Sequence, residues 1–241
     1  MQQYFSKVPV RIGEDYQFEP DQAHHARNVV RLENETVRIV YEGTGYFGTC
    51  FSRGKAFYAH IESEDTSVNE PGAEITAACA PIRREKFEWI LQKITETGVS
   101  RIVPFVSSRC VVKAKKEKEE RQGARWRQIV QEAAEQCKRN KIPEVTEIRK
   151  IEDLGEYLSD VSLAACESEK GRASCISKLL KPGQSVTFVI GPEGGFSREE
   201  TELLTDMGYT PVSLGSRILR AETAAVYACC IAAEINERSG K

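Results

Sequence analysis

The glycine-rich loop at residues 191–195 (GPEGG) is the part of this sequence best suited to binding a ligand. It follows a short apolar run, Val186–Ile190, and precedes Ser197 and Glu200, which form an S-x-x-E capping box for a helix that starts at Arg198. A buried strand, a glycine-rich turn and a capped helix in succession place backbone N–H groups beside one cleft. The alternative is that the glycines only make a tight turn.

The composition of this loop narrows the class of ligand. A phosphate-binding loop has Lys, Ser or Thr beside its glycines, whereas this loop has the carboxylate of Glu193. A carboxylate repels phosphate and attracts ribose hydroxyls or a cation. The spacing also departs from G-x-G-x-x-G, which is against a pyrophosphate-bridged dinucleotide.

A second loop, residues 215–220 (GSRILR), lies close to the first in the chain and is basic where the first is acidic. It ends an expected strand at 210–214 and leads into a helix that begins at about Ala221. Two strand-to-helix turns of this kind are expected to form opposite walls of one pocket. The helix permits close packing against another backbone because it is rich in small residues, namely Ala221, Ala224, Ala225, Ala228, Cys229, Ala232 and Ala233.

The elements that position these loops alternate between strand and helix from residue 74 onward. Strands are expected at 74–80, Arg101–Val106, 161–166, Val186–Ile190 and 210–214, and helices at 84–97, 153–158, 173–180, 198–207 and from 221. The mixed charges of 113–127 predict a solvated helix face and loop, leading into a helix that continues to about residue 138. This alternation favours an α/β fold with a mostly parallel sheet covered on both faces.

The first part of the chain has a different pattern. Strands are expected at Gln2–Phe5, Thr36–Tyr41, 46–51 and 56–62, with one short helix at 22–30 that has Asp21 as its N-cap. Several short strands and one helix predict a small β-barrel. The polar segment 64–72 reads as a linker, so two domains are expected, at 1–70 and 71–241.

Composition sets further bounds. The chain of 241 residues has a net charge of −2 and 40% hydrophobic residues, with no apolar run long enough to span a bilayer and no signal-peptide core, so a cytoplasmic location is expected. The charge balance does not point to nucleic acid globally, although a local basic patch would suffice. Eight cysteines without C-x-x-C or suitable His spacing predict free thiols and no metal site.

Several strings together carry a family resemblance. VIGPEGGFS and LGSRILRAETAA, with KFEWILQKITETGVSRIVPF, SSRCVVK, EAAEQCKRNKIPEV and HHARNVVRL, resemble the RsmE family of 16S ribosomal RNA uridine-N3 methyltransferases in the SPOUT superfamily. They occur in the family's order and cover nearly the whole chain. The resemblance implies a PUA-like β-barrel that binds RNA, a SPOUT α/β domain with a deep C-terminal trefoil knot, S-adenosylmethionine bound in the knot, and a homodimer.

The resemblance also implies roles for individual residues. Arg220 is expected to stabilise the developing uridine anion, and Glu222 is a weaker candidate for a base, because a first-turn carboxylate is also favoured by the helix dipole. Glu167 is either a third pocket wall or an exposed loop charge. The expected cofactor-binding residues are Glu167, Gly191, Pro192, Glu193, Gly194, Gly195, Leu214, Gly215, Ile218, Leu219, Arg220, Thr223 and Ala224.

Contacts to 16S rRNA, within the small ribosomal subunit, are expected from both domains. The candidates are His25, Arg27, Arg31, Arg84, Lys86, Arg109, Lys138, Arg139 and Asn140, and the alternative for each is a solvated surface charge. Gln3 departs from the basic residue that relatives often carry there. Ser216 and Ala225 stand where many relatives have proline, without loss of a functional group.

The function expected from sequence is therefore methyl transfer from S-adenosylmethionine to N3 of a specific uridine in 16S rRNA. An alternative is an RNA-binding or ribosome-assembly protein with the same fold and no catalysis. The intact pair of loops favours the enzyme. A third alternative is methylation of another RNA or of a ribose hydroxyl, because the sequence does not encode which nucleotide enters the site.

Overall fold

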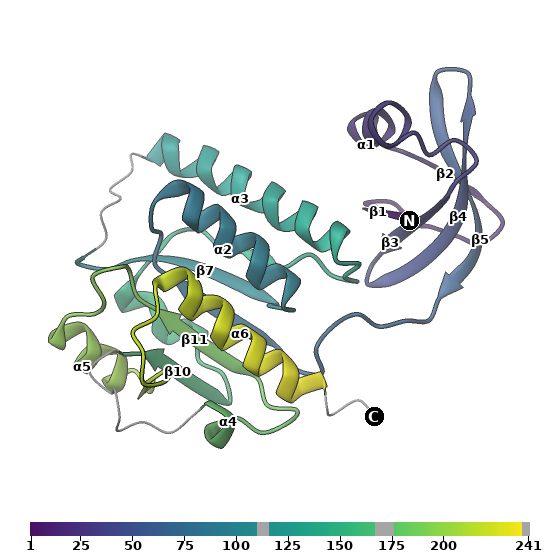
Figure 1. Cartoon of the computed structure of the whole chain (residues 1–241). Coiled ribbons are helices and arrows are strands. Elements are labelled where there is room, and N and C mark those ends of the chain that lie inside the picture. Colours follow the sequence, from purple (N-terminus) through teal and green to yellow (C-terminus); the bar gives the residue numbers. More distant parts are fainter. Residues whose placement is uncertain (110–115, 167–175, 238–241) are drawn as a thin grey trace. The chain divides into compact units, whose positions relative to one another are not determined.

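The computed structural model describes residues 1–109, 116–166 and 176–237. The chain forms two compact units (Figure 1). Unit 1 contains residues 1–70 and 134–141, and unit 2 contains residues 71–133 and 142–241. The structure thus differs from a simple division at residue 70, because the end of the long helix α3 (Lys116–Gln136) and the turn after it belong to unit 1.

Unit 1 is built on a five-stranded sheet. Its strands are β1 (Gln2–Phe5), β2 (Asp15–Gln17), β3 (Thr36–Tyr41), β4 (Thr44–Arg53) and β5 (Ala56–Asp65), in the order β1-β3-β4-β5-β2. β1 runs parallel to β3, and the other pairs are antiparallel. A register shift between Phe47 and Gly48 bends β4 against β5, where a Cβ on Gly48 would meet the His60 carbonyl oxygen at 2.5 Å. The long strands β4 and β5 extend beyond their predicted ends, and β2 is an additional strand.

A short helical segment covers the apolar core of unit 1. It consists of α1 (Pro20–His24) and a π-helical turn, His25–Val30. The predicted N-cap Asp21 is wrong: Glu19 caps the helix through a reciprocal capping box with Gln22, and Pro20 occupies the first turn, where its missing N–H costs nothing. The core beneath is formed by residues such as Tyr4, Phe18, Ile39 and Phe57.

A buried polar network joins the strands of unit 1 to residues 138–140. The Arg38 guanidinium, with 2% of its side chain exposed, donates to Asp65 Oδ2 at 2.7 Å, to Gln3 Oε1 at 2.7 Å and to Asn140 Oδ1 at 3.3 Å. Arg139 forms an ion pair with Glu70, and its carbonyl oxygen accepts a hydrogen bond from Gln3. Every charge in this network has a partner, which is the condition for burying it without a large penalty.

This network corrects part of the predicted RNA surface. Arg139 and Asn140 are 3% and 5% exposed, so their side chains stabilise unit 1 from within and are not available to RNA. Gln3 is fully buried and is likewise unavailable. Lys138 has a left-handed backbone at φ 64° and donates its ammonium to the Glu135 carbonyl. The positive charge of Arg139 therefore serves the fold, and the RNA contact expected of the half-buried Lys138 stays a prediction.

Replacing Asp65 by asparagine should destabilise unit 1 by about 3 kcal/mol, because it leaves the buried Arg38 cation without its carboxylate. Burial alone raises the pKa of Asp65, but hydrogen bonds from Ser67 and Arg38 outweigh it and hold the pKa below its ordinary value. The carboxylate therefore contributes stability above the unfolded-state pKa of about 3.9, and this contribution is lost as pH falls through the lower folded-state pKa. Urea titrations at several pH values measure both effects. The exposed Asp21→Asn is the control, and equal stability of the two variants would refute the assignment.

Unit 2 is a three-layer α/β structure around a parallel sheet. Its strands are β6 (Ile75–Cys79), β7 (Arg101–Val106), β8 (Glu144–Val145), β10 (Val161–Ala165), β11 (Val186–Ile190) and β12 (Thr210–Val212), in the order β12-β10-β11-β6-β7-β8, and β9 (Arg149–Lys150) pairs with β7. All these pairs are parallel. β6 and β11 are buried along their whole length, as expected for central strands covered on both faces.

Helices cover both faces of this sheet. One core contains residues of α2 (Arg84–Glu96), α3, α4 (Ile176–Leu179) and α6 (Ala221–Glu237), and the second contains residues of α5 (Arg198–Asp206) and the 3₁₀-helix Ile151–Tyr157. The small side chains Ala225, Ala228, Cys229 and Ala232 are fully buried, as the close packing predicted for α6 requires. In the part of the chain that the structure describes, every helix is too short or too polar to traverse a lipid bilayer.

The predicted α/β architecture and most of its elements are confirmed. Arg101–Val106 and Val186–Ile190 have their predicted bounds, and Ser197 and Glu200 form the predicted capping box. The segment predicted as a helix at 153–158 is a 3₁₀-helix, and β12 ends two residues early. The closed barrel and the knot remain predictions.

Candidate functional site

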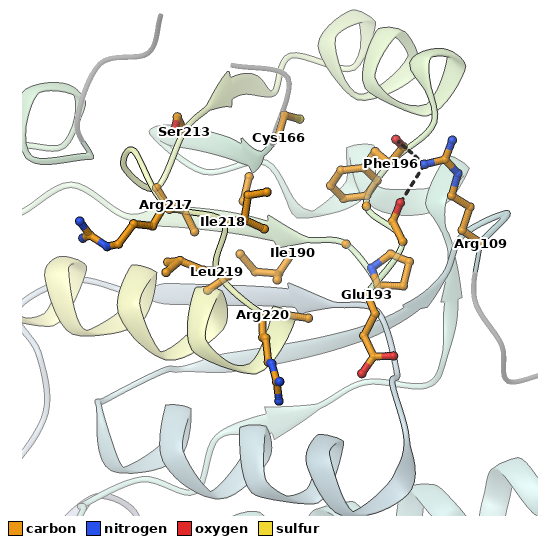
Figure 2. Close-up of a pocket in the computed structure, with 18 of the residues that line it drawn as sticks. Arg109, Cys166, Ile190, Glu193, Phe196, Ser213, Arg217, Ile218, Leu219 and Arg220 are labelled. Carbon is orange, nitrogen blue, oxygen red and sulfur yellow. Dashed lines mark hydrogen bonds between the residues drawn. The ribbon is translucent and has the colours of Figure 1, made fainter. Parts of the chain in front are cut away.

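A pocket of about 840 Å³ lies at the carboxyl ends of β10, β11 and β12. Because these strands are parallel, the loops that follow them meet at one edge of the sheet, which is where α/β proteins bind ligands. The volume is in the range of small-molecule sites. The pocket is lined by Arg83, Lys86, Arg109, Ala165, Cys166, Ile190, residues 191–196, Thr201, Ser213, Leu214, Gly215, residues 217–221 and Ala224 (Figure 2).

The loop 191–195, hereafter the glycine loop, is held by hydrogen bonds to its backbone groups, both from within the loop and from Arg109. Gly195 donates its N–H to the Pro192 carbonyl at 2.9 Å and has a left-handed φ of 64°. Arg109 Nη1 donates to the carbonyl oxygens of Gly194 at 2.8 Å and Phe196 at 3.3 Å (Figure 2). Arg109, predicted to contact RNA, therefore spans the glycine loop and fixes the direction of its carbonyl groups.

The loop 213–220, hereafter the arginine loop, forms the opposite wall. Gly215 has a φ of 119°, a conformation that side-chain-bearing residues rarely adopt. The Ser213 hydroxyl donates to the Gly215 carbonyl at 2.9 Å and accepts from its N–H at 3.3 Å. This local pairing turns the chain so that backbone groups and the aliphatic side chains of Leu214 and Leu219 line the pocket.

A lysine on α2 is shared between two carboxylates at one side of the pocket. Lys86 Nζ lies 2.6 Å from Glu193 Oε1 and 3.5 Å from Glu222 Oε1. The hydrogen bond from Lys86 lowers the pKa of Glu193 and raises that of the lysine. Glu193 is thus held as an anion in the glycine loop. The second oxygen of Glu222, Oε2, is buried and has no hydrogen-bond partner within the described residues.

Three pocket arginines lack such partners. Arg83, Arg217 and Arg220 are exposed, and no ion pair or side-chain hydrogen bond joins them to the residues that the structure describes. Arg83 and Arg220 do contribute favourable charge at Glu193, where they help to lower its pKa. Arg220 and the Glu193 carboxylate extend to the same side of the pocket in Figure 2. The guanidinium groups of Arg83, Arg217 and Arg220 are therefore available to a ligand.

The pocket brings together most of the predicted cofactor residues. Gly191, Pro192, Glu193, Gly194, Gly195, Leu214, Gly215, Ile218, Leu219, Arg220 and Ala224 all line it. Thr223 is exposed on α6 and does not line the pocket, and neither does Glu222, whose Oε1 lies 3.5 Å from Lys86 Nζ. Glu167 lies outside the described residues.

The predicted RNA contacts separate into several groups. Lys86 and Arg109 line the pocket, and Arg84 is exposed beside Glu88 on α2. In unit 1, Arg27 and Arg31 are exposed, and His25 Nδ1 lies 2.8 Å from the Tyr4 hydroxyl. Arg27, Arg31 and Arg84 are thus exposed at the surface, unlike Arg139 and Asn140.

Several pocket residues were not predicted from sequence. Arg83 precedes α2 and Cys166 directly follows β10, so both lie at the carboxyl edge of the sheet, yet neither belongs to a motif. Arg217 lies in the arginine loop, and its position in a predicted wall was an available signal. Phe196 packs its ring against Gly191, where a Cβ would lie 3.1 Å from it. Arg83 and Cys166 reach the pocket through tertiary position alone.

Cys50, Cys79, Cys229 and Cys230 are free thiols in the part of the chain that the structure describes. Complete burial raises the pKa of Cys79 to about 12, so this thiol remains protonated at neutral pH. Within residues 1–109, 116–166 and 176–237, no cluster of three or more His, Cys, Asp or Glu side chains has the geometry of a metal site.

Comparisons with known proteins agree on one family. Residues 69–233 match the family described as an RNA methyltransferase domain. The ribosomal RNA small subunit methyltransferase E of Bacillus subtilis is 33% identical over 242 residues, covering 95% of this chain and 94% of that protein.

Two solved structures are similar over nearly the whole chain. The ribosomal RNA small subunit methyltransferase E from Neisseria gonorrhoeae, bound to S-adenosylmethionine, has a TM-score of 0.86 at 28% identity and covers 96% of each chain. A methyltransferase from Legionella pneumophila, in complex with the same cofactor, has a TM-score of 0.86 at 29% identity and covers 95% of each chain.

Proposed function

This chain belongs to the RNA methyltransferase domain family and, within it, to the RsmE family of ribosomal RNA small subunit methyltransferases; on that premise we propose that it methylates N3 of a uridine in 16S rRNA. Membership makes it an S-adenosylmethionine-dependent rRNA methyltransferase. The observation that carries the finer proposal is the pocket, in which a glycine loop with one carboxylate faces a loop with unpaired arginines.

The pocket fits S-adenosylmethionine in size and in donor set. The glycine and arginine loops offer backbone groups for an adenine ring, and Ile190, Leu214 and Leu219 provide apolar contact. Glu193, held as an anion by Lys86, suits ribose hydroxyls or the field of a sulfonium. When bound, the cofactor supplies an electrophilic methyl group.

The remaining chemistry falls to the chain's own side chains. Methylation of a uracil imide needs the N3 proton removed and the resulting negative charge on O2 and O4 stabilised. We assign the second task to Arg220, because its guanidinium lines the pocket and has no partner among the described residues. Holding the methyl donor and the uracil in fixed alignment lowers the barrier further.

Glu222 is not assigned as the base. It occupies the first turn of α6, where the helix dipole favours a carboxylate, it pairs with Lys86 at 3.5 Å, and it does not line the pocket.

The test is transfer of labelled methyl groups from S-adenosylmethionine to 16S rRNA and to small ribosomal subunits that lack the modification. Nuclease digestion and mass spectrometry of the nucleosides should give 3-methyluridine. A ribose-methylated or differently methylated nucleoside would refute the N3 assignment. RNA binding without any transfer would favour the alternative of a binding or assembly protein.

We also propose the finer architecture that the family implies. The antiparallel β3-β4-β5 sheet of unit 1 supports a PUA-like RNA-binding barrel, with Arg27, Arg31 and His25 as surface contacts. In unit 2 the chain leaves edge strand β12 and returns to pack α6 against the central strands β6 and β11, which supports a trefoil knot. Single-molecule unfolding tests the knot, because the extension of an unfolded chain that is still knotted is shorter than its full contour length.

We propose further that two copies associate through α6 and the adjacent α2. Tyr227 on α6 and Trp89 on α2 are each 44% exposed, and Cys230 is exposed on the same helix as Tyr227. Aromatic side chains at this exposure favour an interface with a second copy.

Tyr227→Asp should therefore weaken the dimer, because a carboxylate replaces an aromatic contact at its centre. We expect the dissociation constant to rise by at least about 30-fold, as for an interface hot spot. Sedimentation velocity over a concentration series measures it. Val68→Asp, at a position 77% exposed in unit 1, is the control, and a monomeric wild-type protein would contradict the proposal.

A further inference from the structure

The pocket carries more positive charge than its cofactor needs. Its lining contains five cationic side chains, Arg83, Lys86, Arg109, Arg217 and Arg220, and one carboxylate, Glu193. Lys86 is neutralised by Glu193 and Glu222, and Arg109 is engaged with two loop carbonyl groups. The three other arginines are exposed without an ion-pair partner among the described residues.

The charge of S-adenosylmethionine does not account for this excess. The molecule has a sulfonium, an ammonium and one carboxylate, so its net charge is positive and several surrounding cations would repel it. A guanidinium is instead well matched to phosphate oxygens, which it can bind through two parallel hydrogen bonds. The unpaired arginines therefore fit a polyanion that enters beside the cofactor.

We propose that Arg83 and Arg217 bind backbone phosphates on either side of the nucleotide that enters the pocket. This inference rests on the proposed function, because it takes the ligand to be the RNA substrate. Arg83 precedes α2, whereas Arg217 belongs to the arginine loop, so the two come from different elements around the pocket. Figure 2 shows the side chains of Arg217 and Arg220 extending from the arginine loop in different directions. Arg217 can therefore contact a phosphate while Arg220 contacts the uracil oxygens.

Ile218, which lies between Arg217 and Arg220 in the arginine loop, supports assigning phosphate binding to Arg217 and the uracil oxygens to Arg220. Ile218 lines the pocket and is 66% exposed, although a large aliphatic side chain at that exposure is unfavourable in water. An unpaired base provides an apolar face for such a side chain. The arginine loop thus presents one phosphate-binding group, one apolar group and one group for the pyrimidine oxygens in sequence.

The test is the salt dependence of RNA binding by Arg83→Gln, Arg217→Gln and the double variant. The probe is a uridine-rich single-stranded RNA oligonucleotide, with affinity measured by fluorescence anisotropy between 50 and 200 mM salt. Each lost phosphate contact should reduce the slope of log affinity against log salt by about 0.7. The affinity loss of the double variant should then be roughly sevenfold larger at the lower salt than at the higher.

Two controls separate this inference from failure of the proposed function. Arg198→Gln removes an exposed charge of α5 outside the pocket lining and should leave the slope unchanged. Calorimetric binding of S-adenosylmethionine should be unaltered in all variants. If wild-type protein binds and methylates RNA but the double variant keeps the full slope, the phosphate assignment is refuted. If wild-type protein neither binds nor methylates RNA, the proposed function itself fails.

Discussion

Gly215→Ala should weaken S-adenosylmethionine binding by about 10- to 100-fold. The residue has a φ of 119°, so a Cβ there adds strain of about 1–3 kcal/mol that the arginine loop relieves by changing its conformation. The pocket depends on the backbone of this loop, which contributes Ser213, Leu214 and residues 217–220 to the lining. Isothermal titration calorimetry with the cofactor measures the loss.

The matched control is Gly183→Ala. Gly183 also has a positive φ, of 83°, with no atom within 4 Å of an added Cβ, and it does not line the pocket. This variant should lose a similar amount of stability while keeping its affinity for the cofactor. Equal affinity in both variants would show that the arginine loop does not hold the cofactor.

A substitution at Gly194 in the glycine loop is a weaker test of cofactor binding than the sequence alone indicates. An added Cβ on Gly194 would make ordinary contacts of 3.6 and 3.7 Å with Arg109. The conformational demand for glycine is therefore clearer at Gly215 and at Gly195, which has a φ of 64°.

Arg220→Ala should lower the rate of methyl transfer by 10²- to 10³-fold, equal to about 2.7–4 kcal/mol in the barrier. The guanidinium is exposed in the pocket without a partner among the described residues, so its removal leaves no buried charge uncompensated. Cofactor affinity should change little, because the contacts proposed for the cofactor are mainly backbone. Single-turnover rates with saturating RNA and cofactor isolate the step.

A conservative variant distinguishes this role from simple RNA attraction. Arg220→Lys keeps the charge but loses the paired donors of the guanidinium, so we expect partial recovery of the rate and full recovery of RNA affinity. A parallel fall in cofactor affinity and rate in Arg220→Ala would contradict the role. So would a rate loss that excess RNA restores.

Local patterns predicted the elements and the main walls of the pocket. The apolar run before GPEGG is β11, the S-x-x-E motif caps α5, and the small-residue segment after residue 220 is α6. In each case the signal lies within a few neighbouring residues. The parallel order of strands then brings the two predicted loops together, as expected for loops at one edge of a parallel sheet.

What the sequence did not predict depends on partners far apart in the chain. Arg139 and Asn140 looked like surface groups, but the carboxylate of Glu70 and the guanidinium of Arg38 compensate their burial. Glu222 and Glu193 are linked through Lys86, more than a hundred residues away. Periodicity reports which face of an element is apolar and contains no information on which distant charge will meet another.

The contribution of residues 134–141 to unit 1 has a consequence for the order in which the protein folds during synthesis. The segment 1–70 emerges first, but its buried Arg38 and half-buried Glu70 contact Asn140 and Arg139 only after residue 141 has left the ribosome. By then, β6, α2, β7 and the whole of α3 have already emerged. The N-terminal unit of the nascent chain therefore stays incomplete until residues 134–141 are synthesised, well after its own last strand, β5, which ends at Asp65.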